Sequence, residues 1–335
     1  MHPLAAAAVV ATLMMLAADP MTGHGVMAAG SEPSAPVVSP SPALAARHVF
    51  VIMMENHGYA DIVGNGSAPW INAAAAAYGM ANHSFGVAHP SQPNYIAATS
   101  GSTDGVTDDS DVTLDVPNIA DQLEAGGRTW KAYMQSLATC NGDLLRSFCG
   151  GQLYARKHDP FVSYQDVQSD PARLARIVDL TQLDADLAAG TVPDLAWISP
   201  DQCHDMHGLE GYGNDPCALV NDQQRIAAGD AFLASTVNAI MASSAWTTGS
   251  LIFVTWDEAG SRDTTGCCGA DPGGGHILTL VISHDTTGPL ASDVAYDHYS
   301  LLASIEAALG VGCMGHTCDT ASVSPMTDLM GLPSP

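Results

Sequence analysis

Two polar pairs in this chain stand where they could bind a metal ion. Glu55 and Asn56 directly follow the apolar segment VFVIMM, and Asp257 and Glu258 directly follow LIFVTW. A third apolar segment, DLAWISP, precedes the polar sequence DQCHDMH at residues 201–207. Carboxylate and amide oxygens are ligands that suit hard divalent cations. One such group could be a helix cap or a solvated turn, but three of them favour a shared site.

A serine with possible catalytic chemistry lies between the first two of these groups. Ser91 belongs to the segment HPSQPNY, which continues as IAATSG in what we expect to be a helix. The backbone N–H groups at a helix start favour both a serine alkoxide and a bound phosphate, although the same position suits an ordinary N-cap. No GxSxG motif surrounds Ser91, and the chain has no Walker loop and no GxGxxG motif. These absences disfavour a Ser-His-Asp hydrolase and nucleotide-driven chemistry.

The charge of the chain restricts its partners. There are 35 acidic residues against 10 Lys and Arg, which gives a formal net charge of −25 at pH 7. Such a chain has no electrostatic attraction for nucleic acid or for an anionic membrane surface, and a phosphate substrate would need local positive charge. A bound cation could supply that charge. Arg156 and Lys157, followed by His158, form the only adjacent basic pair, which could meet a phosphate or simply neutralise nearby acids in a surface turn.

The apolar segments that carry these groups are predicted to be buried strands, separated by helices. The expected strands are Val49–Met54, Asp194–Ile198, Leu251–Thr255 and Ile277–Ile282, and the expected helices include Asp222–Met241 and Tyr299–Leu309. This alternation predicts a three-layer α/β/α sandwich around a largely parallel central sheet. In such sheets ligands bind at the carboxyl ends of the strands, which is where the polar groups lie.

The cysteines predict local disulfides and an oxidising compartment. Their close pairs are Cys140 with Cys149, Cys203 with Cys217, Cys313 with Cys318, and the adjacent Cys267 and Cys268. Zinc ligation is the alternative, but no CxxC…CxxC spacing supports it.

The N-terminal segment is predicted to direct export. Residues 1–29 contain a short apolar stretch and are expected to be a signal peptide, although a buried helix is the alternative. Residues 30–46 are rich in Ser, Pro and Ala and are expected to be disordered. Residues 47–335 are then expected to form a single catalytic domain in a secreted protein.

Eight short motifs together resemble a known family. In order, they are MMENHGY, APWIN, HPSQPNYIAATSG, YARKHDPF, SPDQCHDMH, TWDE, GGGH and HYSLLASIE. The set is similar to the bacterial phosphoesterase family, which includes secreted acid phosphatases, phosphoinositide phosphatases and phospholipases C. The resemblance spans residues 48–309 and is closest to the mycobacterial secreted acid phosphatase type. It implies an alkaline phosphatase-like fold.

The resemblance also implies a role for each matching position. Ser91 matches the nucleophile, and His158 and His207 match further catalytic positions beside the phosphate. The implied metal ligands are Glu55, Asn56, Ser91, Asp257 and Glu258. The positions implied to bind phosphate or a second metal are Asn94, Lys157, Asp205, His276 and His298.

We therefore expect a secreted, metal-dependent acid phosphatase that hydrolyses phosphate monoesters, phosphoinositides among them, through a phosphoseryl intermediate. Calcium or magnesium is favoured over zinc or manganese. Protonated pocket histidines would favour activity at mildly acidic pH. We expect a monomer that binds no nucleic acid and has no membrane-spanning segment after signal removal. The alternatives are a phospholipase C-type phosphodiesterase and a non-catalytic secreted binding protein.

Overall fold

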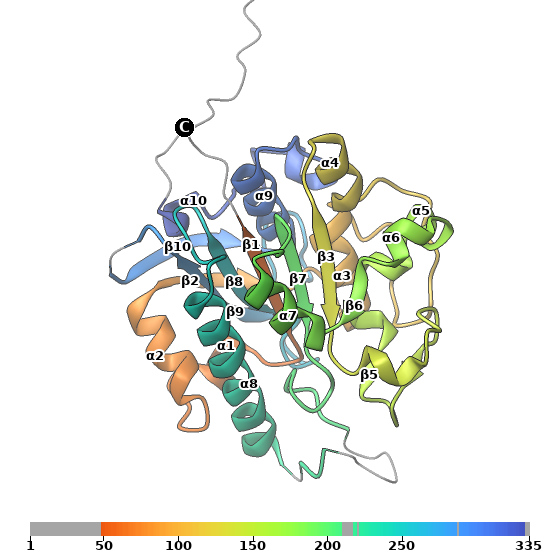
Figure 1. Cartoon of the computed structure of the whole chain (residues 1–335). Coiled ribbons are helices and arrows are strands. Elements are labelled where there is room, and N and C mark those ends of the chain that lie inside the picture. Colours follow the sequence, from red (N-terminus) through yellow and green to blue (C-terminus); the bar gives the residue numbers. More distant parts are fainter. Residues whose placement is uncertain (1–47, 210–216, 220, 287, 332–335) are drawn as a thin grey trace, which may run out of the picture. The chain divides into compact units, whose positions relative to one another are not determined.

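A central sheet of eight strands organises the described part of the chain (Figure 1). The computed structural model describes residues 48–331, apart from 210–216, 220 and 287. The predicted signal peptide (1–29) and the Ser/Pro/Ala-rich segment (30–46) lie outside these residues. The strands, in spatial order, are β10 (Leu290–Tyr296), β2 (Gly79–Phe85), β9 (His276–Ser283), β8 (Leu251–Trp256), β1 (Val49–Met54), β7 (Leu195–Ser199), β3 (Trp130–Met134) and β6 (Ile177–Asp179).

The middle of the sheet is formed by three parallel strands. β1 lies between β8 and β7, and its Ile52 pairs with Val254 on one side and Ile198 on the other. All residues of the three strands are buried. A parallel strand that is covered on both faces has a continuous apolar sequence, because neither face is exposed to water. This explains why the sequence predicted these strands, and β9, to within one residue at each end.

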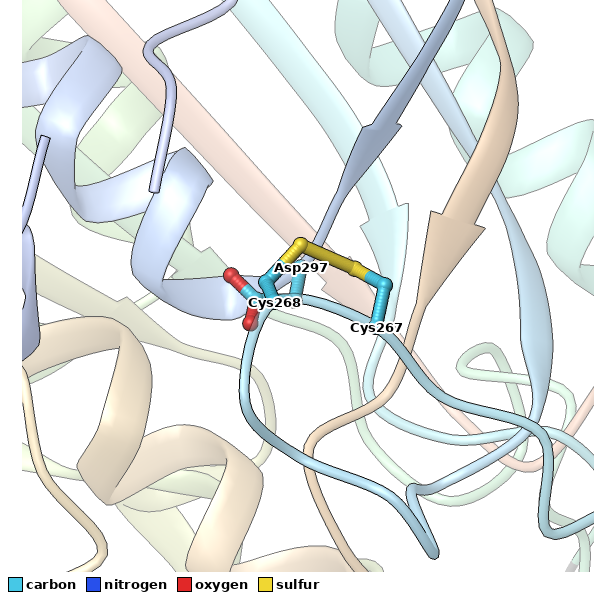
Figure 2. A group of neighbouring side chains, drawn as sticks. All are labelled: Cys267, Cys268 and Asp297. Atoms are coloured by element: carbon cyan, nitrogen blue, oxygen red, sulfur yellow. A yellow bond between two sulfur atoms is a disulfide. The ribbon is translucent and has the colours of Figure 1, made fainter. Parts of the chain in front are cut away.

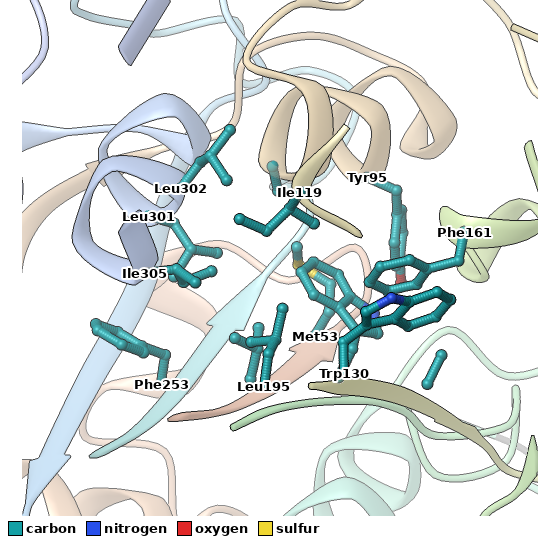
Figure 3. Packing of buried hydrophobic residues seen from close by; sticks show 14 of the residues in the cluster. Met53, Tyr95, Ile119, Trp130, Phe161, Leu195, Phe253, Leu301, Leu302 and Ile305 are labelled. Carbon is teal, nitrogen blue, oxygen red and sulfur yellow. The ribbon is translucent and has the colours of Figure 1, made fainter. Parts of the chain in front are cut away.

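Helices cover both faces of the sheet. Val51 and Met53 of β1 belong to one hydrophobic core, together with residues of α3, α4 and α9, while Phe50 and Ile52 belong to the other, with residues of α2, α7 and α8. Figure 3 shows the first core, where Met53 lies among side chains such as Leu301 of α9. The bounds of these helices are α2 (Pro69–Ala77), α3 (Ser91–Ser100), α4 (Ile119–Ala125), α7 (Thr181–Ala189), α8 (Asp222–Ala242) and α9 (His298–Leu309).

This arrangement confirms the predicted three-layer sandwich and the two predicted helices, α8 and α9. The sheet is largely parallel, and β9 runs antiparallel to both β8 and β2. Four strands of the central sheet were not predicted, because their sequences are short or contain polar residues. They are β2, β3, β6 and β10. The last is an edge strand with mostly exposed or half-exposed side chains, so it has no continuous apolar run.

Short elements and disulfides complete the described fold. The short elements are α1 (Tyr59–Ile62), α5 (Gln165–Ser169), α6 (Pro171–Leu174), α10 (Thr327–Met330) and the hairpin β4 (Phe148–Cys149) and β5 (Tyr154–Ala155). The predicted local disulfides are confirmed as Cys140–Cys149, Cys203–Cys217, Cys267–Cys268 and Cys313–Cys318. None of the helices in the described residues is both long and apolar enough to cross a bilayer.

Candidate active site

The polar groups that follow β1, β7 and β8 meet at one edge of the sheet. Asn56 follows β1, and its backbone N–H donates to Asp257 Oδ1 after β8 at 2.9 Å. The backbone N–H of Glu55 donates to the carbonyl oxygen of Asp205 at 2.8 Å. The structure therefore brings together the ends of the three apolar segments, as expected for parallel strands.

Ser91 lies within this cluster. It is the first residue of α3, and only 1% of its surface is exposed. Its hydroxyl donates to Glu55 Oε2 at 3.0 Å and lies 3.4 Å from Glu258 Oε1, while Lys157 Nζ donates to Ser91 Oγ at 3.3 Å. A carboxylate beside a hydroxyl can take its proton, and an ammonium group can stabilise the resulting oxyanion. The serine therefore has the neighbours that a nucleophile needs.

The carboxyl groups around Ser91 are crowded. Burial and the charges of Glu55 and Glu258 raise the pKa of Asp257 well above its ordinary value. Burial and Glu55 also raise the pKa of Glu258 to about 7, although His89 opposes the rise. The same two causes raise the pKa of Asp205. Several buried carboxylates so close together remain ionised only if positive charge compensates them.

The cluster offers ligand atoms for that positive charge. Within the described residues, the buried oxygens Asn56 Oδ1, Asp257 Oδ2 and Asp205 Oδ2 have no hydrogen-bond partner. Buried polar atoms are almost always paired, so unpaired ones in a cluster indicate a missing ligand. Oxygens of this type suit a hard divalent cation. The residues after β1 and β8 therefore fit the metal that the sequence predicted.

Two further groups were predicted beside the phosphate, His158 and His207. His158 lies between two carboxylates, with Nε2 3.2 Å from Glu55 Oε1 and Nδ1 3.4 Å from Asp205 Oδ2. The backbone N–H of His207 donates to Asp205 Oδ1 at 2.7 Å, and the two imidazole rings lie 6.4 Å apart. The structure thus places both histidines around Asp205.

The pKa values of two predicted histidines, His158 and His298, differ from what was expected. Burial, assisted by Lys157 and His207, lowers the pKa of His158 well below its ordinary value. Burial also lowers the pKa of His298 to about 4. Burial, which the sequence did not reveal, therefore opposes the protonation that was expected of these two histidines.

Lys157 places a positively charged ammonium group beside Ser91. It donates to Asp109 Oδ2 at 2.8 Å as well as to Ser91. Burial alone would lower the pKa of Lys157, but Glu55 and Asp109 outweigh this effect and raise it above its ordinary value. Its position beside Ser91 is compatible with the interpretation that the basic pair meets a phosphate, and its pairing with Asp109 is compatible with the alternative. The guanidinium of Arg156 instead pairs with Asp111 at 3.1 Å.

Asn94 and His298, which were predicted to bind phosphate or a second metal, contact backbone groups instead. Asn94 accepts the N–H groups of Val87 and Ala88 at 2.8 and 3.0 Å and donates to the carbonyls of Ala88 and Pro90, so its amide holds the loop before Ser91. His298 Nε2 donates to the carbonyl of Asp257 at 2.5 Å and thereby supports the backbone beneath the carboxylates.

His276 lies outside the Ser91 cluster. Its Nε2 bonds with the carbonyl of Asn82 at 2.8 Å, and its ring stacks on Tyr59 with 4.6 Å between centroids. The structure therefore brings eleven predicted residues into or directly beneath the cluster and leaves His276 beside it.

Two residues of the cluster were not singled out from the sequence. Tyr95 donates to Glu55 Oε1 at 2.7 Å, and His89 contacts Glu258 Oε2 through Nδ1 and the Asp263 carbonyl through Nε2 at 2.8 Å. The spacing contained a signal for Tyr95, since residues four apart share one face of a helix and Tyr95 is four residues after Ser91.

A separate group of possible ligands lies at the end of β10. Among the described residues, only Cys267, Cys268 and Asp297 bring three His, Cys, Asp or Glu ligand atoms within 4.8 Å of one another (Figure 2). The two sulfur atoms are bonded to each other, so they are not thiolate ligands. The carboxylates of Glu55, Asp257 and Glu258 are spaced more widely, with Ser91 between two of them.

Known proteins resemble this chain in sequence and fold. The profile of the Phosphoesterase family matches residues 65–312. A phosphatidylinositol-3-phosphatase from Mycobacterium tuberculosis is 29% identical over 286 residues, which cover 85% of this chain and 83% of that protein. An acid phosphatase from Aspergillus fumigatus is 27% identical over 295 residues, which cover 86% of this chain and 60% of that protein.

Solved structures share the architecture. A protein in the alkaline phosphatase superfamily from Vibrio parahaemolyticus matches with a TM-score of 0.55 and 14% identity, over 87% of this chain and 71% of that one. A phosphonate monoester hydrolase of Agrobacterium radiobacter matches with a TM-score of 0.52 and 11% identity, over 86% and 78%. These likenesses show an alkaline phosphatase-like fold. Since the family profile spans most of the chain, the protein belongs to the Phosphoesterase family and is a hydrolase of phosphoric ester bonds.

Proposed function

We propose that this protein is a secreted, metal-dependent phosphomonoesterase with Ser91 as its nucleophile. The observation that carries the proposal is the position of Ser91 Oγ, 3.0 Å from Glu55 Oε2 and 3.3 Å from Lys157 Nζ, at the start of a buried helix. Relatives named phosphatidylinositol-3-phosphatase and acid phosphatase support a monoester substrate, with phosphoinositides as one class. The disulfides and the apolar N-terminal segment support secretion.

In this mechanism Glu55 accepts the proton of the Ser91 hydroxyl, and Ser91 Oγ attacks phosphorus. The bond from phosphorus to the leaving oxygen breaks, which forms phosphoserine, and the leaving oxygen takes a proton from water and departs as the alcohol. Water then attacks phosphorus, the bond to Ser91 Oγ breaks, and Ser91 regains a proton as inorganic phosphate leaves. Lys157 stabilises the negative charge of the transferring group.

The residues that would hold a divalent cation are Glu55, Asn56, Ser91, Asp257 and Glu258. Bound there, a cation lowers the pKa of the serine hydroxyl and neutralises charge on the phosphoryl group. The all-oxygen ligand set favours calcium or magnesium over zinc or manganese. Asp205, His158 and His207 lie beyond Glu55 and would contact the phosphate or a second ion.

The test is hydrolysis of p-nitrophenyl phosphate and of bis-p-nitrophenyl phosphate by the purified protein, with and without chelator. We expect monoester hydrolysis that chelator abolishes and that Ser91→Ala reduces by at least about 10³-fold, as for loss of a nucleophile. Near wild-type activity of the folded Ser91→Ala variant would refute the nucleophile. Hydrolysis of the diester alone would move the assignment to a phospholipase C-type phosphodiesterase, and hydrolysis of neither would favour a binding protein.

A further inference from the structure

A pocket opens at the same edge of the sheet as the Ser91 cluster. It is a pocket of about 460 Å³ formed by residues 58–61, which follow β1, residues 259–263, which follow β8, and His276 at the start of β9. The segments that form its walls thus continue directly from the Asn56 and Glu258 positions. We call it the Arg262 pocket, after the only Lys or Arg in its lining.

The Arg262 pocket adjoins the Ser91 cluster through one side chain. His89 contacts Glu258 Oε2 with Nδ1 and the carbonyl of Asp263, in the pocket wall, with Nε2. A single imidazole ring therefore separates the carboxylate next to Ser91 from the pocket.

The guanidinium of Arg262 has no partner within the described residues, although the chain is strongly acidic. Nearly all other described Lys and Arg side chains form an ion pair with a carboxylate. Arg146 is the other described exception. An unpaired guanidinium that lines a pocket is available to donate several hydrogen bonds to a ligand.

The rest of the lining offers hydrogen-bond acceptors and a flat ring surface. Asp61 Oδ2 accepts the Gly58 N–H at 3.0 Å, and Asp263 accepts two backbone N–H groups, one on each carboxylate oxygen. Asp263 Oδ1 also accepts the Thr265 hydroxyl at 2.7 Å, so the oxygens that can each accept a further bond are those of Asp61 and Asp263 Oδ2. Tyr59 and His276 stack with their rings 7° from parallel, which provides a rigid aromatic pair beside the acceptors.

The charged groups that line the Arg262 pocket indicate which kind of ligand it binds. Two carboxylates and one guanidinium leave the Arg262 pocket without net positive charge, which disfavours a second phosphate group. Fixed acceptors, a free donor and an aromatic pair suit neutral hydroxyl groups on a ring. The pocket beside Lys157 differs, because its one cation, Lys157, is already paired with Asp109.

We propose that the Arg262 pocket binds the polyhydroxylated leaving group of a phosphate monoester, a sugar or cyclitol, and that Arg262 is a specificity-determining residue. The proposal rests on the proposed phosphomonoesterase function. Arg262 donates to substrate hydroxyls, and Asp61 and Asp263 accept from them. A site built to hydrogen-bond substrate hydroxyls discriminates strongly against analogues that lack them.

The experiment compares glucose 6-phosphate with n-butyl phosphate, which has the same primary alkoxide leaving group without hydroxyls. We measure kcat/KM for both with the wild type, Arg262→Gln and Arg146→Gln, the last being a matched loss of an exposed, unpaired guanidinium. We expect the ratio of glucose 6-phosphate to n-butyl phosphate to fall about tenfold in Arg262→Gln, mainly through KM, and to change less than twofold in Arg146→Gln.

Further substrates identify the source and class of the ligand. If kcat/KM in Arg262→Gln falls equally for myo-inositol 3-phosphate and for dioctanoyl phosphatidylinositol 3-phosphate, the pocket binds a free and a lipid-borne cyclitol alike. If kcat/KM falls for only one of these substrates, that substrate identifies the source of the ligand. If kcat/KM in Arg262→Gln falls more for fructose 1,6-bisphosphate than for glucose 6-phosphate, Arg262 binds a second anionic group rather than hydroxyls, which would overturn the proposal. An unchanged ratio in Arg262→Gln would also overturn it. If the wild type hydrolyses no monoester at all, the proposed function itself fails.

Discussion

At the scale of single residues, Tyr95 shows how a buried hydroxyl can orient a carboxylate. The two oxygens of Glu55 have different partners: Oε1 accepts the Tyr95 hydroxyl at 2.7 Å, and Oε2 accepts the Ser91 hydroxyl at 3.0 Å. Tyr95 also stacks on His158, with 5.5 Å between ring centroids. Glu55 is therefore held so that one oxygen faces the nucleophile.

Removing that hydroxyl should affect catalysis more than binding. In Tyr95→Phe we expect kcat to fall about tenfold with KM nearly unchanged, because a lost hydrogen bond to a charged group is of that order. The matched control is Tyr164→Phe, which removes an equally buried hydroxyl that contacts Thr99 on the same helix, at 2.6 Å. Equal losses of kcat in both variants, measured with p-nitrophenyl phosphate, would contradict the positioning role of Tyr95.

Asp257 should control metal content. It is fully buried, its Oδ1 accepts the Asn56 N–H, and its Oδ2 has no hydrogen-bond partner in the described residues. Asp257→Asn keeps an acceptor for Asn56 but removes the charge, so we expect both bound metal, measured by mass spectrometry, and activity to fall. Asp230→Asn, a buried carboxylate on α8 that holds the start of α2, should keep its metal. Unchanged metal in Asp257→Asn would refute its role as a ligand.

At the scale of elements, the loop before α3 decides where Ser91 lies. The Asn94 amide makes two hydrogen bonds to N–H groups and two to carbonyls in residues 87–90, and so ties the helix to the loop that precedes it. His89 in that loop extends toward Glu258. The position of the nucleophile thus depends on an amide that makes no contact with Glu55 or Lys157 in the described structure.

Asn94→Ala should therefore reduce both stability and activity. We expect the free energy of unfolding in urea to fall by about 2–3 kcal/mol, because several buried backbone groups lose their partners. Asn82→Ala, which removes one solvent-exposed hydrogen bond to Asp293, should cost less than about 0.5 kcal/mol. A stability loss in Asn94→Ala no larger than that of Asn82→Ala would show that the loop does not depend on this amide.

At the scale of the whole molecule, buried acids make stability depend on pH. Glu306 of α9 is 3% exposed, accepts a hydrogen bond from Gln122 Nε2 at 3.0 Å, and has its pKa raised by burial from 4.5 to about 7. A carboxyl whose pKa is higher in the folded state binds more protons there. Its contribution to stability is therefore present at low pH and is lost as the pH rises from about 4.5 to about 7.

Glu306→Gln removes this titration. Relative to the wild type, the variant should gain about 2 kcal/mol in free energy of unfolding between pH 5 and pH 8, less than the full pKa shift implies because part of the titration lies below pH 5. The measurement is urea unfolding of both proteins at the two pH values. The difference between the proteins isolates Glu306 from other titrating carboxyls, and a difference that is equal at both pH values would contradict the prediction.

Much of this protein could be predicted from its sequence because the controlling interactions are local. The apolar runs of β1, β7 and β8 showed buried strands, the polar pairs after them showed which edge of the sheet carries the chemistry, and close spacing paired the cysteines. The order of strands in a parallel sheet then brings Glu55 near Asp257 without any knowledge of side-chain packing.

Only the tertiary structure decided what depends on packing between distant segments. It placed His276 against Tyr59 rather than Ser91, used the Asn94 amide to hold a loop, and buried His158, which lowers the pKa of its ring. It also left Arg262 without a partner among the described residues, in a pocket whose wall His89 links to Glu258. Residue types and spacing determined which chemistry this chain carries, whereas burial and neighbours far along the chain set the charge and the role of each group, because desolvation and contact distance exist only in the folded state.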